Sequence, residues 1–488
     1  MSALATLESR FRQLSALEGA ASMLHWDSAT MLPEASGSVR GEQLAALADI
    51  AHEKISSAEM PDLFAQAQRE ATSPITQASL REMQRRWQHA TALPASLVGA
   101  LTKARHGCEQ IWREAKRTHD YALFLPSFRE VLALTREAAA AKASALNLSP
   151  YDALLDSFDP EMRCNIINPL FSDLKTWLPA LVAQAEEAQK HHAPALPFAA
   201  PLAAQEALGR HLMLALGFNT KQGRIDTSAH PFCGGVPGDV RITTRYREEN
   251  AADALFGVLH ETGHALYEQN LPDEWRGLPI GEARGMSAHE SQSLFIEMQI
   301  CRGEAFLNYL QPQLQPQLGI TISPAQLRQQ VQRVERSFIR VNADEVTYPL
   351  HIILRYELEQ ALLSGDLSPE DLPAAWNEKM QQYLGITPPN VAQGCLQDIH
   401  WPEGMLGYFP TYTLGAMIAA QLMASMKRTL DADGLVAKGE FAPITSWLAT
   451  HWHQKASSLS LQEMLQEATG EGLNAALYRA HLHQRYGG

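Results

Sequence analysis

Apolar residues recur at spacings of three and four along most of this chain, and this period constrains the fold more than any other feature of the sequence. Such spacing puts apolar side chains on one face of an α-helix. Alanine is abundant in these segments and β-branched runs are rare, which also favours helix. We therefore expect amphipathic helices over residues 4–23, 43–55, 97–115, 121–146, 167–189, 251–268, 287–310, 324–340, 343–363, 368–383, 412–429 and 461–483.

Two stretches depart from the helical pattern. Residues 224–246 contain glycines, prolines and an alternating run from Val240 to Tyr246, which predicts a small β-hairpin or short sheet. Residues 191–205 contain three prolines and are either a linker or a loop between packed helices. With no repeat of fixed period, we predict a mainly all-α fold: a single body over residues 1–488, with its chemistry within residues 230–412.

The composition narrows the possible partners and location. The 488 residues carry a formal charge of −14, which disfavours nucleic acid, and 45% apolar residues exclude general disorder. No apolar run approaches the roughly 18–20 residues of a membrane helix, and the N-terminus lacks the apolar run of a signal peptide. We expect a cytoplasmic protein without a membrane partner, whose five scattered cysteines are reduced and mostly buried.

The strongest chemical signal is an HExxH motif. On a helix, His260 and His264 lie one turn apart on one face, so both imidazoles can bind one zinc ion. Glu261 then lies beside the metal, where it can take a proton from water at the metal. The alternative is an ordinary core helix with two hydrogen-bonded histidines.

A catalytic zinc needs a third protein ligand and an open fourth position. Glu290, in HESQS, follows His264 by 26 residues, enough for a loop and a second helix to return to the metal. By spacing alone, Glu297 and Glu282 are competing candidates.

The chain resembles the M32 metallocarboxypeptidases, whose namesake is carboxypeptidase Taq. Five motifs occur in the family's order: DVRIT (239–243), HETGH (260–264), HESQS (289–293), IRVNAD (339–344) and GCLQDIHW (394–401). A sixth segment, HWDSATMLP at residues 25–33, is also similar to the family. The resemblance implies that Glu290 is the third ligand, with one zinc per subunit and cobalt as a possible substitute. It also implies a boat-shaped helical subunit with a deep groove, similar to neurolysin and angiotensin-converting enzyme, and a homodimer. The implied activity removes single residues from peptide C-termini, with broad side-chain tolerance and poor action at proline.

Such an exopeptidase must hold the α-carboxylate of its peptide substrate. An arginine fork suits this task, and Arg340 is our candidate, with an i+4 ion pair to Asp344 as the structural alternative. The family pattern suggests His230 as a second donor, and Arg241 is a further candidate. Asp239, Arg241 and Thr243 alternate along the expected strand, whose edge would either bind an extended peptide or serve a structural network.

The negative oxygen that develops during peptide hydrolysis needs a hydrogen-bond donor besides the metal. Tyr412 and Tyr408, in GYFPTYTLG, are candidates by analogy with related gluzincins, and His400 is a further one. Either tyrosine ring would equally serve as groove lining or core.

Two other functions compete with the carboxypeptidase. One is an oligopeptidase or endopeptidase on the same scaffold, with Arg340 structural and the groove open at both ends. The other is a helical binding protein with a structural zinc, which would leave Glu261 without a role.

Overall fold

Helices make up most of the structure, as predicted, and a computed structural model describes residues 2–192 and 194–487. The α-helices are α1 (Ala3–Thr30), α2 (Gly37–Ile55), α3 (Met60–Glu70), α4 (Pro74–Thr91), α5 (Ala95–Thr118), α6 (Tyr121–Leu146), α7 (Pro150–Phe158), α8 (Cys164–Ala188), α9 (Leu202–Ala215), α10 (Ala251–Gln269), α11 (Met286–Leu294), α12 (Glu304–Leu318), α13 (Pro324–Val331), α14 (Tyr348–Ser364), α15 (Leu372–Leu384), α16 (Pro410–Met426), α17 (Ala432–Lys438), α18 (Ala442–His451), α19 (Leu461–Thr469) and α20 (Ala475–Tyr486).

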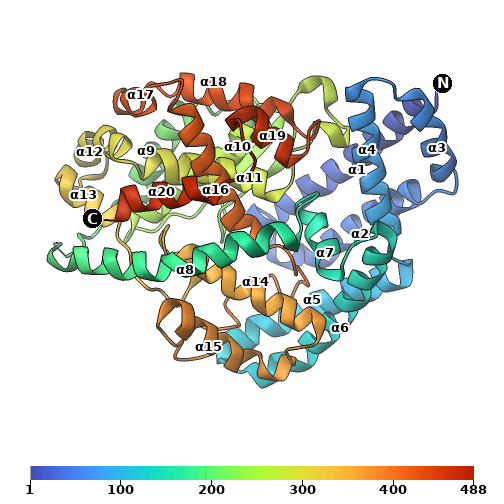
Figure 1. The fold of residues 1–488 in the computed structure, drawn as a ribbon, viewed down its shortest axis with the longest axis horizontal. Coiled ribbons are helices and arrows are strands. Elements are labelled where there is room, and N and C mark those ends of the chain that lie inside the picture. Colours follow the sequence, from blue (N-terminus) through green and yellow to red (C-terminus); the bar gives the residue numbers. More distant parts are fainter. Residues whose placement is uncertain (1, 193, 488) are drawn as a thin grey trace.

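The arrangement brings distant parts of the chain together. Figure 1 shows α8 crossing the view, with α14 and α15 below it and α16 and α20 above it. The N-terminal helices α1 to α4 gather at the right of the same view, and α10 and α11 lie near its centre. Among the residues described, no helix is both long and apolar enough to cross a membrane.

Local capping explains why some helices begin and end where the sequence predicts. The helix predicted over residues 121–146 is confirmed at both ends. The Asp120 side chain accepts the backbone N–H of Leu123, and Asn147 takes the left-handed conformation (φ 56°) that closes a helix.

Four predicted helices differ from the structure: two divide and two are shorter. The one over 287–310 divides into α11, a π-helical segment, Phe295–Cys301, and α12, which begins after the extended Gly303. The one over 461–483 divides at Gly470, which has φ +88°. Those over 324–340 and 343–363 shorten to α13 and α14, because residues between them form an irregular segment with one 3-10 turn, Arg340–Asn342.

The predicted β structure is a three-stranded sheet. It contains β1 (Gly223–Thr227), β2 (Phe232–Val236) and β3 (Asp239–Thr244), in the order β1-β3-β2. β2 and β3 form an antiparallel hairpin, and β1 runs parallel to β3. Because β3 is the central strand and both of its edges are paired, the prediction that its edge binds a peptide is wrong.

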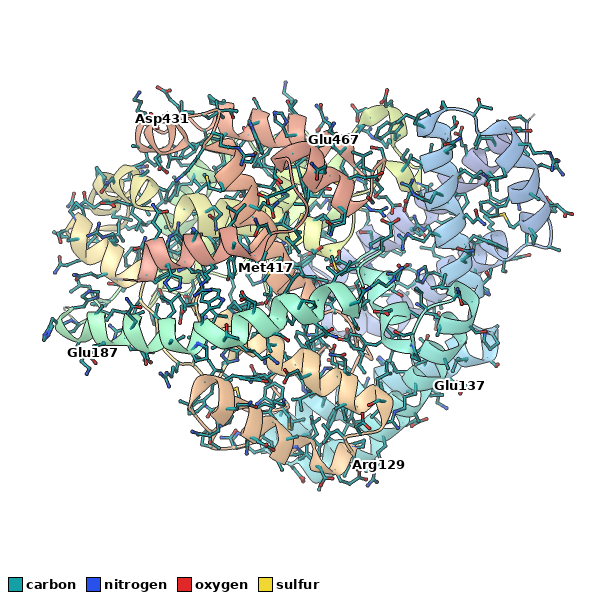
Figure 2. All side chains as sticks on the ribbon, in the orientation of Figure 1. Arg129, Glu137, Glu187, Met417, Asp431 and Glu467 are labelled. Carbon is teal, nitrogen blue, oxygen red and sulfur yellow. The ribbon has the colours of Figure 1, made fainter. Side chains whose placement is uncertain are left out.

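The two largest of four apolar clusters among the described residues stabilise the body. The larger one surrounds α16, whose Met417 is fully buried, and the smaller one joins α1, α3 and α4 through residues such as Leu7, Phe11 and Met60. Figure 2 shows Met417 near the centre of the view, whereas the labelled charged residues lie towards its edges: Arg129, Glu137, Glu187, Asp431 and Glu467. All five cysteines are free thiols, and three of them are buried, as predicted.

Candidate active site

Helix α10 carries the HExxH residues on one face. Asn250 caps its first turn, and buried apolar residues including Leu255, Val258 and Leu259 hold it in the core. The rings of His260 and His264 lie 5.1 Å apart between centroids. The i, i+4 spacing therefore brings the two imidazoles together as predicted.

Two glycines allow the neighbouring helices to approach Glu290. A Cβ at Gly263 of α10 would lie 2.3 Å from the carbonyl oxygen of Gln292 on α11. A Cβ at Gly415 of α16 would lie 2.9 Å from the Cβ of Glu290. Any larger residue would separate these helices, so both glycines are needed for the close packing that positions the carboxylate.

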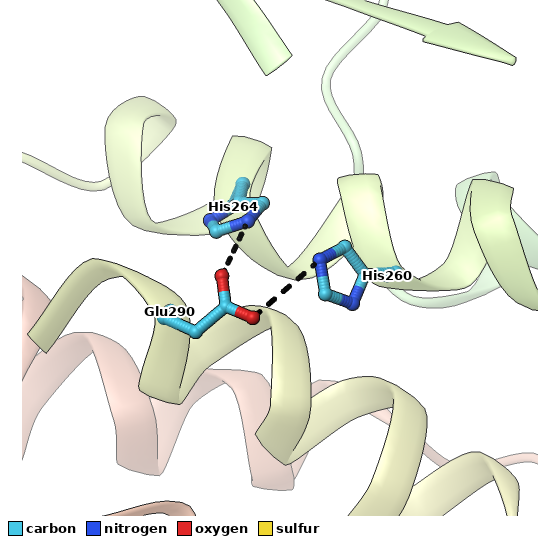
Figure 3. A group of neighbouring side chains, drawn as sticks. All are labelled: His260, His264 and Glu290. Carbon is cyan, nitrogen blue, oxygen red and sulfur yellow. Dashed lines mark ion pairs between the residues drawn. The ribbon is translucent and has the colours of Figure 1, made fainter. Parts of the chain in front are cut away.

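Glu290 reaches both histidines from α11, as Figure 3 shows. Its Oε2 lies 3.3 Å from His264 Nε2, and its Oε1 lies 4.0 Å from His260 Nε2. One potential ligand atom from each of these three residues lies within 4.8 Å of the others. This set of two imidazole nitrogens and one carboxylate oxygen, on two helices, could hold a metal ion.

The other nitrogen of each imidazole is held by the protein. His260 Nδ1 hydrogen-bonds Glu297 Oε2 at 2.9 Å, so Glu297 supports a histidine and does not compete with Glu290. His264 Nδ1 lies 2.6 Å from His289 Nδ1, and His289 Nε2 lies 2.9 Å from Glu268 Oε1. Such bonds orient imidazoles towards a metal.

Sequence reasoning missed His289 and Glu268, and it named Glu297 only as a competing ligand. The clue to His289 was its place directly before Glu290 in HESQS, whereas Glu268 stands only one helical turn beyond His264. The remaining candidate ligand, Glu282, lies elsewhere and binds Arg86 at 2.6 Å.

Burial and neighbouring charges shift the pKa values of the residues in the cluster. Burial raises the pKa of Glu261 to about 7. Burial also lowers the pKa of His264 to about 4, whereas nearby carboxylates outweigh burial at His260 and raise its pKa to about 10. Glu261 Oε2 is buried and has no hydrogen-bond partner among the described residues, so it is free to receive a proton from a water molecule.

Arg340 lies in a second polar cluster, and its carboxylate partner is not Asp344, the structural alternative. Its Nε and Nη2 donate to Asp398 Oδ1 at 3.0 and 2.9 Å, and its Nη1 donates to the Tyr348 hydroxyl at 2.6 Å. Asp344 instead accepts backbone N–H groups, including that of Thr347. The alternative i+4 pair does not form, because residues 340–342 form a 3-10 turn and the chain then extends at Ala343.

Asp398 binds a second arginine on its other oxygen. Arg355 Nε and Nη2 both lie 2.7 Å from Asp398 Oδ2. Burial alone would raise the pKa of Asp398, but the two guanidinium groups hold it below its ordinary value. Sequence analysis missed this carboxylate, although it lies within the GCLQDIHW motif.

The three predicted hydrogen-bond donors lie together next to Arg340. The Tyr412 hydroxyl lies 3.3 Å from His400 Nε2, the Tyr408 and His400 ring centroids are 5.3 Å apart, and the Arg340 guanidinium lies 4.9 Å from the Tyr412 ring. Burial raises the pKa of both tyrosines above the ordinary value, so both hydroxyls stay protonated.

A buried carboxylate holds the loop that precedes these tyrosines. Glu359 accepts the Trp401 Nε1–H at 2.9 Å, the Gly407 N–H at 2.9 Å and the Tyr151 hydroxyl at 2.7 Å. Burial raises the pKa of Glu359 to about 7.

The remaining sequence candidates lie in other surroundings. Arg241 pairs with Asp239 at 2.7 Å and stacks on Trp26 of α1 at 4.5 Å, so these contacts join the sheet to the N-terminal helix. His230 is exposed in the loop between β1 and β2. Within the described part of the chain, neither side chain forms a hydrogen bond or ion pair with Arg340.

Known proteins resemble this chain over nearly its whole length. A model of the carboxypeptidase Taq (M32) metallopeptidase family matches residues 6–486. Thermostable carboxypeptidase 1 of Thermus thermophilus is 37% identical, over 97% of this chain and 96% of the relative, and carboxypeptidase 1 of Bacillus subtilis is 35% identical over the same shares. The solved structure of Trypanosoma cruzi metallocarboxypeptidase 1 is 40% identical, covers 99% of both chains and superposes with a TM-score of 0.96.

Proposed function

The chain belongs to the carboxypeptidase Taq (M32) family of metallopeptidases, and from this premise we propose that it removes single residues from the free C-termini of peptides, with zinc as its metal. Membership makes it a metallocarboxypeptidase. The proposal adds that the metal is zinc, that the enzyme tolerates most C-terminal side chains but acts poorly at proline, and that individual residues have the roles given below.

His260, His264 and Glu290 would hold one zinc ion per subunit, with cobalt as a possible substitute. The single observation that carries this assignment is the convergence of their ligand atoms within 4.8 Å, with the opposite nitrogen of each histidine hydrogen-bonded. When bound, zinc supplies Lewis acidity that lowers the pKa of a water molecule to about 7.

Glu261 would act as the general base that takes a proton from the attacking water. Its unpartnered, buried Oε2 and its raised pKa support this role. Tyr412, Tyr408 and His400 would donate hydrogen bonds to the oxygen that becomes negative, and the protonated state of both tyrosines supports this assignment.

Arg340 would bind the α-carboxylate of the substrate, with His230 as a second donor and Arg241 as the alternative anchor. Arg340 lies against the ring of Tyr412, and Tyr412 belongs to α16, the helix that packs on Glu290. This position near the metal cluster supports Arg340 as the anchor. Family resemblance adds a homodimer as a prediction, which light scattering tests, and the N-terminal sequence adds a cytoplasmic location.

An endopeptidase on the same scaffold is the second candidate. The observation that favours it is the Nε and Nη2 edge of Arg340, which Asp398 already occupies. In that case Arg340 would be structural and the enzyme would need no free carboxylate.

Mass spectrometry of a peptide during digestion tests the proposal. We expect a ladder of products shortened one residue at a time from the C-terminus, lost with a chelator and restored by zinc. The same peptide with an amidated C-terminus should be nearly inert. Internal fragments from both peptides would contradict the proposal and support the endopeptidase.

A further inference from the structure

A cavity of about 760 Å³ lies beside the metal cluster and has no role in the proposed chemistry. It is bordered by α1, the β2–β3 turn, the C-terminal end of α10 and the segment that leads into α11, and it opens to solvent. Ala16 and Ala20 of α1, Gly235 of β2 and His289 of α11 belong to its walls.

The cavity is continuous with the residues that support the metal cluster. Glu268 and His289 line it, and His289 is the residue that contacts His264 Nδ1. His289 and Glu290 are neighbours on α11, so their side chains point about 100° apart around the helix. Glu290 packs against Gly415 of α16, the helix of Tyr412, whereas His289 faces the cavity.

The proposed carboxylate anchor and the cavity are therefore reached from the metal cluster through different residues. Consider a peptide whose carboxylate binds Arg340 and whose last peptide bond lies at the metal cluster. Its residues before that bond must bind elsewhere on the protein. The cavity beyond His264 and His289 offers them space, an inference that rests on the proposed carboxypeptidase function.

The charges of the cavity wall are largely engaged within the protein. The pairings are Glu282 and Glu18 with Arg86, Asp273 with Arg276, Glu268 with His289, and Arg12 with the Arg276 carbonyl. The rest of the wall is rich in apolar groups: Ala16, Ala20, Met23, Val236, Leu271 and Met286. A ligand side chain would thus find apolar surface and few charges to pair with.

We propose that this cavity binds an apolar side chain of the substrate. This side chain belongs to the third or fourth residue, counted from the C-terminal residue as the first. The cavity wall contains none of the proposed metal ligands, whereas the two residues that flank the cleaved bond lie at the metal cluster. The cavity therefore begins beyond the penultimate residue. Transfer of a leucine or phenylalanine side chain from water to such a surface favours binding roughly 10-fold to 100-fold.

The test compares kcat/KM for blocked pentapeptides made of glycine and alanine, with phenylalanine, aspartate or lysine at the third or fourth position from the C-terminus. We expect phenylalanine to raise kcat/KM roughly 10-fold to 100-fold over glycine at one of these positions, and aspartate and lysine to give no such gain. Equal values for all residues would overturn the proposal.

A cavity-filling variant links the preference to this place. Ala20→Trp should abolish the gain from phenylalanine, and Ala16→Trp, one turn away on the same exposed face, should do the same. Ala29→Trp, exposed on α1 but outside the cavity wall, is the matched control and should keep the preference. Preservation of the full preference in folded Ala20→Trp and Ala16→Trp proteins would overturn the proposal.

A blocked dipeptide with a free C-terminus separates this proposal from the proposed function, because it is too short to reach the cavity. All four proteins should hydrolyse it at similar rates. Failure of the wild-type enzyme on both the dipeptide and the pentapeptides would overturn the carboxypeptidase function, and the upstream site with it. Hydrolysis of the dipeptide without any preference in the pentapeptides would overturn the upstream site alone.

Discussion

Replacement of Arg340 by methionine separates a substrate anchor from a structural ion pair. The guanidinium makes two bonds to Asp398 and one to Tyr348, and the side chain is only 7% exposed. Arg355, fully buried, binds the other oxygen of the same carboxylate through two nitrogens. Arg355→Met is thus a matched control, because each variant leaves Asp398 with one arginine.

The expected sizes of the two effects differ. Loss of one partner from a buried ion pair costs about 3–5 kcal/mol when the other charge is left alone. Since Asp398 keeps one guanidinium in either variant, we expect both variants to lose about 2–3 kcal/mol of unfolding free energy. If Arg340 also binds the substrate carboxylate, its loss removes a charge-assisted hydrogen bond of about 1.5–3 kcal/mol, roughly 10-fold to 150-fold in kcat/KM.

The assay measures kcat/KM on a free-acid peptide and on its amidated form, at a temperature where all three proteins are folded. Arg340→Met should lose roughly 10-fold to 150-fold on the free acid and little on the amide, which never made the bond. Arg355→Met should affect both peptides alike. Equal losses on the two peptides in Arg340→Met would refute the anchor and leave His230 or Arg241 to be tested.

Four further predictions address the metal cluster and the fold. Glu261→Gln should retain zinc by atomic absorption but lose nearly all turnover, because an amide cannot accept the proton; near wild-type kcat would sink the base assignment. Glu290→Ala should lose zinc on dialysis, since two protein ligands bind weakly, and stoichiometric zinc would disprove this ligand. His289→Phe should weaken zinc affinity about 10-fold to 100-fold in a competition with a chelator, and unchanged affinity would remove its supporting role. Glu359 has a pKa of about 7 in the folded protein against 4.5 for an exposed glutamate, so the folded state holds its proton more tightly and wild-type stability falls relative to Glu359→Gln as pH rises through this interval. The difference in unfolding free energy between the two proteins, measured by urea unfolding, should change by about 3 kcal/mol between pH 4.5 and pH 8. A constant difference would contradict the raised pKa of Glu359.

The sequence by itself determined the features that depend on neighbouring residues. The two histidines of HETGH meet because helix geometry places residues i and i+4 on one face. Both ends of α6 were predictable because its caps are local. The choice of Glu290 over Glu297 needed the family resemblance, since spacing alone allowed both.

Only the tertiary structure decided which distant residues pair. The structural alternative for Arg340 was an ion pair with Asp344, four positions away, yet Arg340 binds Asp398, 58 residues along the chain, because the segment around it is not helical. The bond between His289 and His264 and the cavity beside it likewise depend on how α1, α10 and α11 pack. An apolar period reports which face of a helix is buried, but it carries no information on which helix covers that face, and this decides the partners of each polar side chain.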